Sequence, residues 1–192
     1  MNKPLFLFVG KSSSGKTTVA DQLERKYGLK QVYSYCTREP RYDGEIGHIF
    51  VSENDFNNLG KLAAYTLYNG HKYGTTFAQL DECSIYVVDV IGVKNLLDNC
   101  KDYNRQICVL YFDSTVYNRI NRMINRGDSD TQIISRLLQD ERDDWHHQLD
   151  ALVWHYANIE RINVELYKID ANKKIADVEE QVMYYVNKYK ED

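Results

Sequence analysis

Apolar runs and segments with helical periodicity alternate along the chain. Apolar runs at residues 5–9, 84–90 and 106–112, together with shorter or mixed stretches at 31–34 and 164–169, are predicted as strands. The periodicity of an amphipathic helix is found at residues 16–27, 93–98, 116–125, 133–156 and 174–188. Buried strands that alternate with helices are typical of a parallel sheet with both faces covered. The pattern therefore predicts an α/β fold with a five-stranded, mostly parallel sheet flanked by helices.

Two stretches interrupt this alternation. Residues 35–83 are rich in turn residues and short β-like pieces, so we expect an inserted subdomain there. Residues 126–132 (RGDSDTQ) form a polar break between two helical segments, which fits either a mobile lid or a solvated corner between helices. The expected organisation is a single domain over residues 1–192. Its core lies at about 1–34 and 84–192, the insertion at about 35–83 and the lid at about 126–132.

The composition narrows the class of protein without identifying a function. The 192 residues suffice for one domain, and 43% apolar with 27% charged residues exclude a disordered chain. The longest apolar run, residues 5–9, is too short to cross a bilayer, and no secretory leader is visible. We therefore expect a cytoplasmic protein without a membrane partner. The net charge of −4 argues against nucleic acid as a partner.

The cysteine and histidine patterns argue against a disulfide scaffold and against a metal site. The four cysteines share no CxxC spacing, which favours reduced thiols over a disulfide scaffold or a zinc site. His146-His147 and His155 fall on a predicted helix with polar neighbours, where solvated or packed histidines are commoner than metal ligands. We expect no metal centre built from these residues.

Residues 10–17 (GKSSSGKT) fit the phosphate-loop pattern G-x-x-x-x-G-K-[ST] at every position. They lie between a predicted buried strand and a predicted helix, where backbone N–H groups can surround phosphate oxygens. In this motif Lys16 reaches the β- and γ-phosphates, and the Thr17 hydroxyl binds Mg²⁺. A chance Gly/Ser turn is the alternative, and the strand–loop–helix context disfavours it. The candidate ATP-binding residues are Gly10, Ser12, Ser13, Ser14, Gly15, Lys16, Thr17 and Thr18.

A second candidate anion site follows the loop. Arg38 and Arg41 lie three residues apart in the segment SYCTREPR, and two such guanidinium groups can converge on one phosphate. This segment resembles the acceptor segment S-x-x-T-R-x-P-R of the guanylate kinase family. The resemblance continues through GKLAAY and GHKYGT (residues 60–75), DVIGV (89–93) and the arginines of residues 122–137. It spans roughly residues 5–137 in the order of the family.

The resemblance implies a reaction and a set of site residues. The reaction is Mg²⁺-dependent transfer of the ATP γ-phosphoryl group to a nucleoside monophosphate, with GMP as the first choice, in purine nucleotide metabolism. Catalysis would come mainly from alignment and positive charge, because the attacking phosphate oxygen is already ionised. By resemblance the catalytic residues are Lys16, Arg122, Arg126 and Arg136. The acceptor-binding residues are Ser34, Arg38, Arg41, His48, Tyr73, Thr75 and Asp89.

Ala64 departs from the family, which has a guanine-reading glutamate at this place. Alanine cannot accept the hydrogen bonds that a carboxylate accepts from guanine, so guanine preference is open. A kinase of the same fold that acts on another nucleotide or on a sugar phosphate, as the ribose bisphosphate phosphokinases do, is the alternative. A non-catalytic binding module is a third hypothesis, which the complete phosphate loop disfavours. We expect small-molecule nucleotides as partners and leave monomer and homodimer open.

Overall fold

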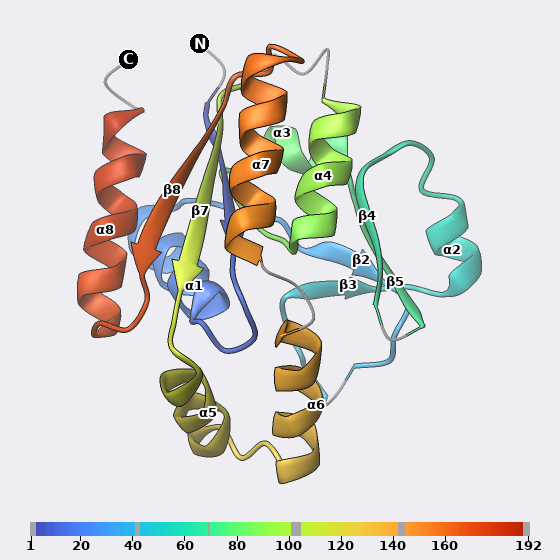
Figure 1. Ribbon diagram of the computed structural model, residues 1–192. Coiled ribbons are helices and arrows are strands. Elements are labelled where there is room, and N and C mark those ends of the chain that lie inside the picture. Colours follow the sequence, from blue (N-terminus) through green and yellow to red (C-terminus); the bar gives the residue numbers. More distant parts are fainter. Residues whose placement is uncertain (1–2, 41–42, 69, 101–104, 142–144, 190–192) are drawn as a thin grey trace.

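A computed structural model describes residues 3–40, 43–68, 70–100, 105–141 and 145–189 (Figure 1). The strands are β1 (Leu5–Val9), β2 (Ser34–Cys36), β3 (His48–Phe50), β4 (Leu62–Tyr68), β5 (His71–Thr76), β6 (Ile85–Val87), β7 (Ile107–Asp113) and β8 (Val164–Asp170). The helices are α1 (Lys16–Tyr27), α2 (Glu53–Asn57), α3 (Phe77–Glu82), α4 (Val90–Asn99), α5 (Val116–Asn125), α6 (Asp130–Glu141), α7 (Trp145–Asn158) and α8 (Ile175–Lys188). No helix in these ranges is long and apolar enough to cross a membrane.

The main sheet is parallel, with the strand order β6-β1-β7-β8. The α/β fold predicted from the sequence is thereby confirmed. The fifth predicted strand, residues 31–34, is reduced to a single parallel bridge between Gln31 and Ile85. The chain leaves the main sheet at once, because Ser34 already begins β2 of the second sheet.

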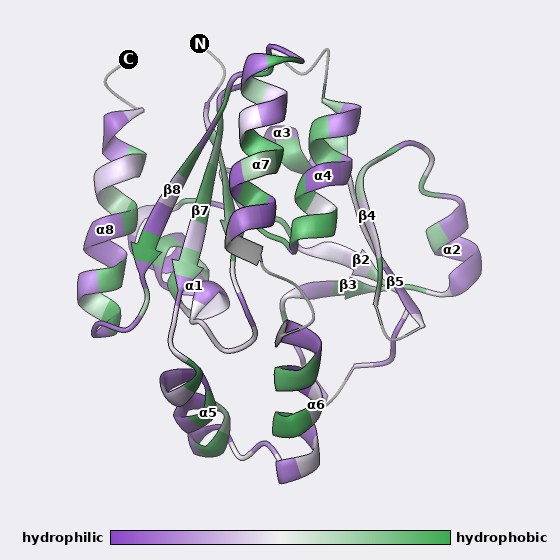
Figure 2. Ribbon diagram, viewed as in Figure 1, coloured by the Kyte–Doolittle hydropathy of each residue, from purple (hydrophilic) through white to green (hydrophobic). Residues whose placement is uncertain are grey.

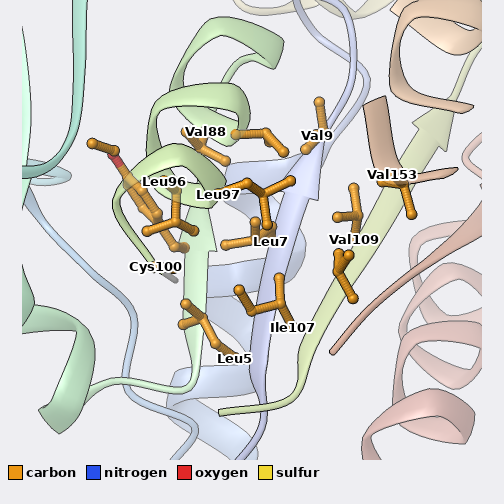
Figure 3. Close-up of a cluster of buried hydrophobic side chains, with 14 of the residues drawn as sticks. Leu5, Leu7, Val9, Val88, Leu96, Leu97, Cys100, Ile107, Val109 and Val153 are labelled. Carbon is orange, nitrogen blue, oxygen red and sulfur yellow. The ribbon is translucent and has the colours of Figure 1, made fainter. Parts of the chain in front are cut away.

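Two apolar cores cover the two faces of the main sheet. Leu5, Leu7 and Val9 of β1 belong to the core beneath α4 and α7, part of which Figure 3 shows. Phe6 and Phe8 point the other way, into the core beneath α1 and α8. Successive residues of a strand face opposite sides, so a strand buried on both sides has to be apolar throughout. This explains the uninterrupted apolar run of residues 5–9, and Figure 2 shows the same green colouring along β7.

A second sheet has the order β3-β2-β5-β4 and lies to the right of the main sheet in Figure 1. Its strands all fall within residues 34–76, in or at the edge of the stretch predicted as an insertion. Strand β4 packs against α4, which joins this sheet to the core of the main sheet. The side chain of Gln79 in α3 adds a second link, since its Nε2 donates to the carbonyl oxygen of Tyr33 at 2.9 Å.

The helical segment predicted at residues 133–156 is two helices, α6 and α7, and residues 142–144 between them lie outside the described ranges. The predicted lid is also shorter as a loop, because Asp130 already begins α6 and only residues 126–129 separate α5 from α6. Figure 1 places α5 and α6 beyond the ends to which β7 and β8 point. The carboxyl ends of parallel strands are where α/β folds bind ligands.

Candidate phosphate-loop site

The loop at residues 10–15 joins β1 to α1, as the motif predicts. Gly10 has φ +155°, and a Cβ atom there would lie 2.7 Å from the carbonyl oxygen of Phe112. Gly15 precedes the first residue of α1 with φ +100°, a conformation that residues with side chains rarely adopt. Both glycines of the motif are therefore required by the path of the backbone, which leaves the loop N–H groups at the N-terminus of α1.

Lys16 is folded back onto the loop. Its ammonium group donates to the carbonyl oxygens of Gly10 at 2.6 Å and Lys11 at 3.0 Å, and to the Ser14 hydroxyl at 3.2 Å. Burial lowers the pKa of Lys16 to about 8, and the carboxylates of Asp140 and Asp89 counteract part of this effect. The ammonium is thus a desolvated positive charge, held inside the loop where a phosphate oxygen can approach it.

A cavity of about 420 Å³ opens on one side of the loop. It is lined by Ser13, Gly15, Lys16, Thr17, Thr18, Arg122, Asn125 and Arg126. A second cavity of about 380 Å³ shares Gly15, Thr18 and Arg122 with it and extends to Lys173 and Ile175 beyond β8. We call these two cavities the donor side, because they contain most of the residues that the motif assigns to ATP.

Two further cavities lie on the other side of the loop, which we call the acceptor side. One has a volume of about 380 Å³ and includes Gly10, Ser12 and Lys16 in its lining. The other, of about 260 Å³, lies against the second sheet. They share four residues, namely Thr66 of β4, Val87 at the end of β6, and Val88 and Asp89 between β6 and α4. Lys16 therefore lines a cavity on each side of the loop.

Asp89 is placed at the centre of the acceptor side by its role as the N-cap of α4. Its carboxylate accepts from the Gly92 N–H at 2.6 Å and from the Thr66 hydroxyl at 3.2 Å. Burial raises the pKa of Asp89, although both hydrogen bonds oppose the shift. Thr66 and Tyr86, which also lines the smaller cavity, were not identified from the sequence. Both lie within runs that alternate or are continuously apolar, so their pattern indicates strand structure rather than a site.

The structure brings together four of the residues expected to bind the acceptor. Ser34, His48, Tyr73 and Asp89 all line the smaller cavity of the acceptor side. The rings of His48 and Tyr73 meet edge to face, with centroids 5.4 Å apart.

Two other expected acceptor residues, Arg38 and Thr75, do not line these cavities. Arg38 makes a two-point ion pair with Glu45, at 2.6 and 2.9 Å, and lies over the ring of Phe50. Thr75 is fully buried and donates its hydroxyl hydrogen to Gln79 Oε1 at 2.9 Å. Neither is among the cavity-lining residues. Arg41 lies outside the described ranges.

Ala64 is buried and is not among the residues that line the acceptor side. Its side chain is 1% exposed and belongs to the core shared with α4, and in the β4–β5 ladder it pairs with the buried Thr75. The ladder is irregular between Leu62 and Ala64 but regular from Ala64 to Tyr68, so Ala64 and Thr66 lie on the same face of β4. Thr66 occupies the position on β4 that opens to both acceptor-side cavities.

The three arginines that the resemblance marks as catalytic, Arg122, Arg126 and Arg136, have partners within the protein. Arg122 donates to the carbonyl oxygens of Ser13, Ser14 and Ala171, at 3.2, 3.1 and 2.6 Å. Arg122 therefore holds the backbone of the loop in place. Its side chain also lines the donor side. Arg126 forms an ion pair with Asp128, and Arg136 lies 3.7 Å from the same carboxylate.

Asp128 and Asp140 are two site residues that sequence reasoning missed. Asp128 lies between two of the expected lid arginines, and this acid among basic residues is a signal that could have identified it. Asp140 gave no comparable signal. It accepts from the backbone N–H and the hydroxyl of Ser12, which is 128 residues away, and forms an ion pair with Arg119. Among the described residues, no group of three His, Cys, Asp or Glu side chains is arranged to hold a metal ion.

Two proteins that are similar to this chain in sequence are guanylate kinases. No family model matches the chain. A guanylate kinase of Geobacter metallireducens is 28% identical over 146 residues, which cover 69% of this chain and 70% of that protein. A guanylate kinase of Clostridium tetani is 29% identical over 137 residues, covering 66% of this chain and 65% of that protein.

The fold has a counterpart among solved structures. The crystal structure of guanylate kinase from Anaplasma phagocytophilum matches with a TM-score of 0.55 at 15% identity, covering 96% of this chain and 85% of that one. At this identity the match shows the shared phosphate-loop kinase fold. In sequence and in fold, this chain is therefore related to the guanylate kinase family.

Proposed function

We propose that this protein transfers the γ-phosphoryl group of ATP to a nucleoside monophosphate. The observation that carries this proposal is the position of Lys16, which lines a cavity on each side of the phosphate loop. A phosphoryl group that passes between two bound nucleotides needs a fixed positive charge at the point where they meet. The relation to guanylate kinases supports the same reaction class.

In the proposed reaction the residues bind, orient and neutralise charge. The loop N–H groups and Lys16 would hold the donor phosphates, with Arg122 fixing the loop from behind. Arg126 and Arg136 would contribute charge from the lid once the phosphates compete with Asp128 for them. A general base is unnecessary, because the attacking oxygen belongs to an ionised phosphate. The reaction depends on alignment of the two phosphates by the protein and does not need a covalent bond to a protein side chain.

Mg²⁺ would accompany the donor rather than occupy a site made by the protein alone. The exposed Thr17 side chain lines the donor side next to Lys16, so its hydroxyl fits the role of a single protein ligand. The phosphate oxygens would supply further ligands. When bound, the ion neutralises charge on the phosphates that Lys16 does not reach.

We propose GMP as the first acceptor, from the relation to guanylate kinases. A specific observation favours a second candidate, a different phosphorylated acceptor. The acceptor side presents a threonine and an apolar edge, since Leu67 and Ile91 line its larger cavity and are 60% and 58% exposed. Among the described residues that line the acceptor side, the carboxylates are those of Asp89 and Asp140. Asp140 is paired with Arg119, which leaves Asp89 as the better candidate to read guanine N–H groups.

The test is an ADP-release assay with Mg²⁺-ATP and a panel of acceptors. The panel contains GMP, AMP, CMP, UMP, dTMP and a sugar phosphate, and each is compared with the ATPase rate without acceptor. Preferential stimulation by GMP is the expected result. Stimulation by the sugar phosphate or by another nucleotide alone would favour the second candidate, and no stimulation by any acceptor would contradict the proposed function.

A further inference from the structure

Asp140, near the end of α6, is a buried carboxylate in contact with the phosphate loop. It is 3% exposed, and it accepts from the Ser12 N–H at 2.9 Å and from the Ser12 hydroxyl at 3.1 Å. A guanidinium nitrogen of Arg119 in α5 lies 2.6 Å from the same carboxylate. These contacts join three segments that are far apart in sequence: the loop, α5 and α6.

Arg119 is more deeply buried than Asp140, with 1% of its surface exposed. A guanidinium group removed from water is tolerated only when it is paired and hydrogen-bonded. The Asp140 carboxylate supplies this pairing, so separating the two side chains would leave an uncompensated charge inside the protein. The pair is therefore expected to persist when ligands bind, unlike the more exposed ion pairs that Arg126 and Arg136 make with Asp128.

The position of Asp140 next to the loop allows two roles. The carboxylate could occupy an anion site that a phosphate must take over, or it could hold the loop in shape for a phosphate bound nearby. The lining of the cavities decides between them. Ser12 and Asp140 line the acceptor side, whereas Ser13, Gly15 and Thr17 line the donor side. Donor phosphates can therefore bind without displacing Asp140, and displacement would strand Arg119.

We propose that Asp140 and Arg119 are positioning residues of the phosphate loop. Asp140 fixes the Ser12 end of the loop from α6, and Arg119 fixes Asp140 from α5. Arg122, one turn after Arg119, holds the Ser13 and Ser14 carbonyl oxygens from the same helix. The loop is thus shaped for phosphates before any nucleotide arrives. This inference rests on the proposed function only in assuming that the loop binds a nucleoside diphosphate.

The first experiment measures the dissociation constant of Mg²⁺-ADP by calorimetry. The double variant R119M/D140L replaces the ion pair with apolar side chains of similar size, a change that buried pairs often tolerate. We expect it to fold and to bind ADP about tenfold more weakly, because the loop has lost a charge-assisted hydrogen bond. Asp140→Asn keeps an acceptor for the Ser12 N–H, so it should recover part of the lost affinity.

The control is Glu179→Gln, which weakens another ion pair, between the buried Glu179 of α8 and the half-exposed Lys26 of α1 at 2.6 Å. It should lower the melting temperature without changing ADP affinity. An unchanged dissociation constant in R119M/D140L would show that the pair has only a structural role, and this would overturn the proposal. Tighter ADP binding in that variant would show that Asp140 competes with phosphate, which would also overturn the proposal.

A second measurement does not depend on nucleotide binding. The Ser12 N–H should exchange slowly with solvent in the ligand-free parent and at least about tenfold faster in R119M/D140L, while amides of β1 are unchanged. Equal exchange at Ser12 in both proteins would overturn the proposal. If the parent binds no ADP, the proposed function fails, and the exchange of Ser12 still decides whether Asp140 holds the loop.

Discussion

At the scale of single residues, the environment of Lys16 links the motif to its chemistry. Its ammonium group satisfies three loop oxygens in the absence of nucleotide, and burial has lowered its pKa to about 8. At neutral pH the side chain is still charged. Phosphate oxygens offer it a stronger partner than neutral carbonyl groups, so its charge should matter most when the phosphoryl group moves.

Replacing Lys16 by alanine tests this role. We expect kcat to fall by about 10³-fold, the effect of losing one well-placed charge in a transition state. The fold should survive, because the loop path depends on Gly10 and Gly15 and a desolvated charge has been removed. Steady-state kinetics and circular dichroism measure the two effects. Near-normal turnover by a folded Lys16→Ala protein would contradict the proposed reaction.

The burial of Ala64 changes the result that we expect for a second substitution, Ala64→Glu. From the sequence alone, Ala64→Glu would raise kcat/KM for GMP relative to AMP by supplying the missing carboxylate. With the side chain in the core, the new carboxylate is buried without a partner, so we expect a loss of about 3 kcal/mol in the free energy of unfolding. Urea denaturation measures this loss.

The comparison variant is Thr66→Val, which keeps the shape of a side chain that lines the acceptor side. It should remain stable and raise the KM of the acceptor without changing the KM of ATP, because only the hydroxyl bonded to Asp89 is removed. A stable Ala64→Glu protein with a raised GMP preference would instead show that position 64 reaches the acceptor.

At the scale of elements, α5 and α6 are held in different ways at their two ends. Near Ser12 they are joined to the loop by the buried pair of Arg119 and Asp140. At the turn of residues 126–129, the partly exposed Arg126 pairs with Asp128, a kind of contact that contributes little to stability. The turn can therefore open while the ends near the loop stay in place.

We expect hydrogen exchange at residues 126–132 to slow when a two-substrate mimic binds. The lid arginines would exchange Asp128 for phosphate oxygens and bring the turn over the donor side. Exchange measured by mass spectrometry, with and without the mimic, tests this expectation, and the peptide of β7 serves as an internal control. Equal exchange at 126–132 in both states would make this turn a static corner.

At the scale of the whole molecule, the two sheets differ in how well they are buried. The main sheet lies between two apolar cores, whereas β2 and β3 of the second sheet are three residues each. Cys108 in β7 and Cys36 in β2 are both buried free thiols, one in each sheet. Their reaction with an alkylating reagent therefore reports the opening of each sheet separately.

We expect Cys36 to be alkylated faster than Cys108 under native conditions, because small sheets open locally more often than central strands. Burial raises the pKa of Cys108 from 9 to about 12, so at pH 8 its thiolate fraction falls from roughly one in ten to roughly one in ten thousand. Its reaction should stay slow up to pH 10 and become fast only in denaturant. Mass spectrometry of the labelled peptides gives both rates, and equal rates would indicate one cooperative unit.

The sequence by itself determined the features that depend on neighbouring residues. Continuous apolar runs predicted strands buried on both faces, and the two glycines of residues 10–15 predicted the loop between β1 and α1. These features follow from backbone sterics and from the period of apolar positions, which act within a few residues. The resemblance to guanylate kinases, and not this local pattern, pointed to Ser34, His48, Tyr73 and Asp89, which the structure gathers around one cavity.

Only the tertiary structure decided where individual polar side chains are directed. Ala64 is packed in the core while Thr66, two residues further along β4, lines the acceptor side, and Arg38 is engaged by Glu45. Asp140 meets Ser12 across 128 residues. Each of these contacts depends on the register of strands or on the packing of helices from distant parts of the chain, and a local pattern carries no information on either. The direction of a buried charge is set by the partner that can satisfy it, and that partner is brought near only by folding.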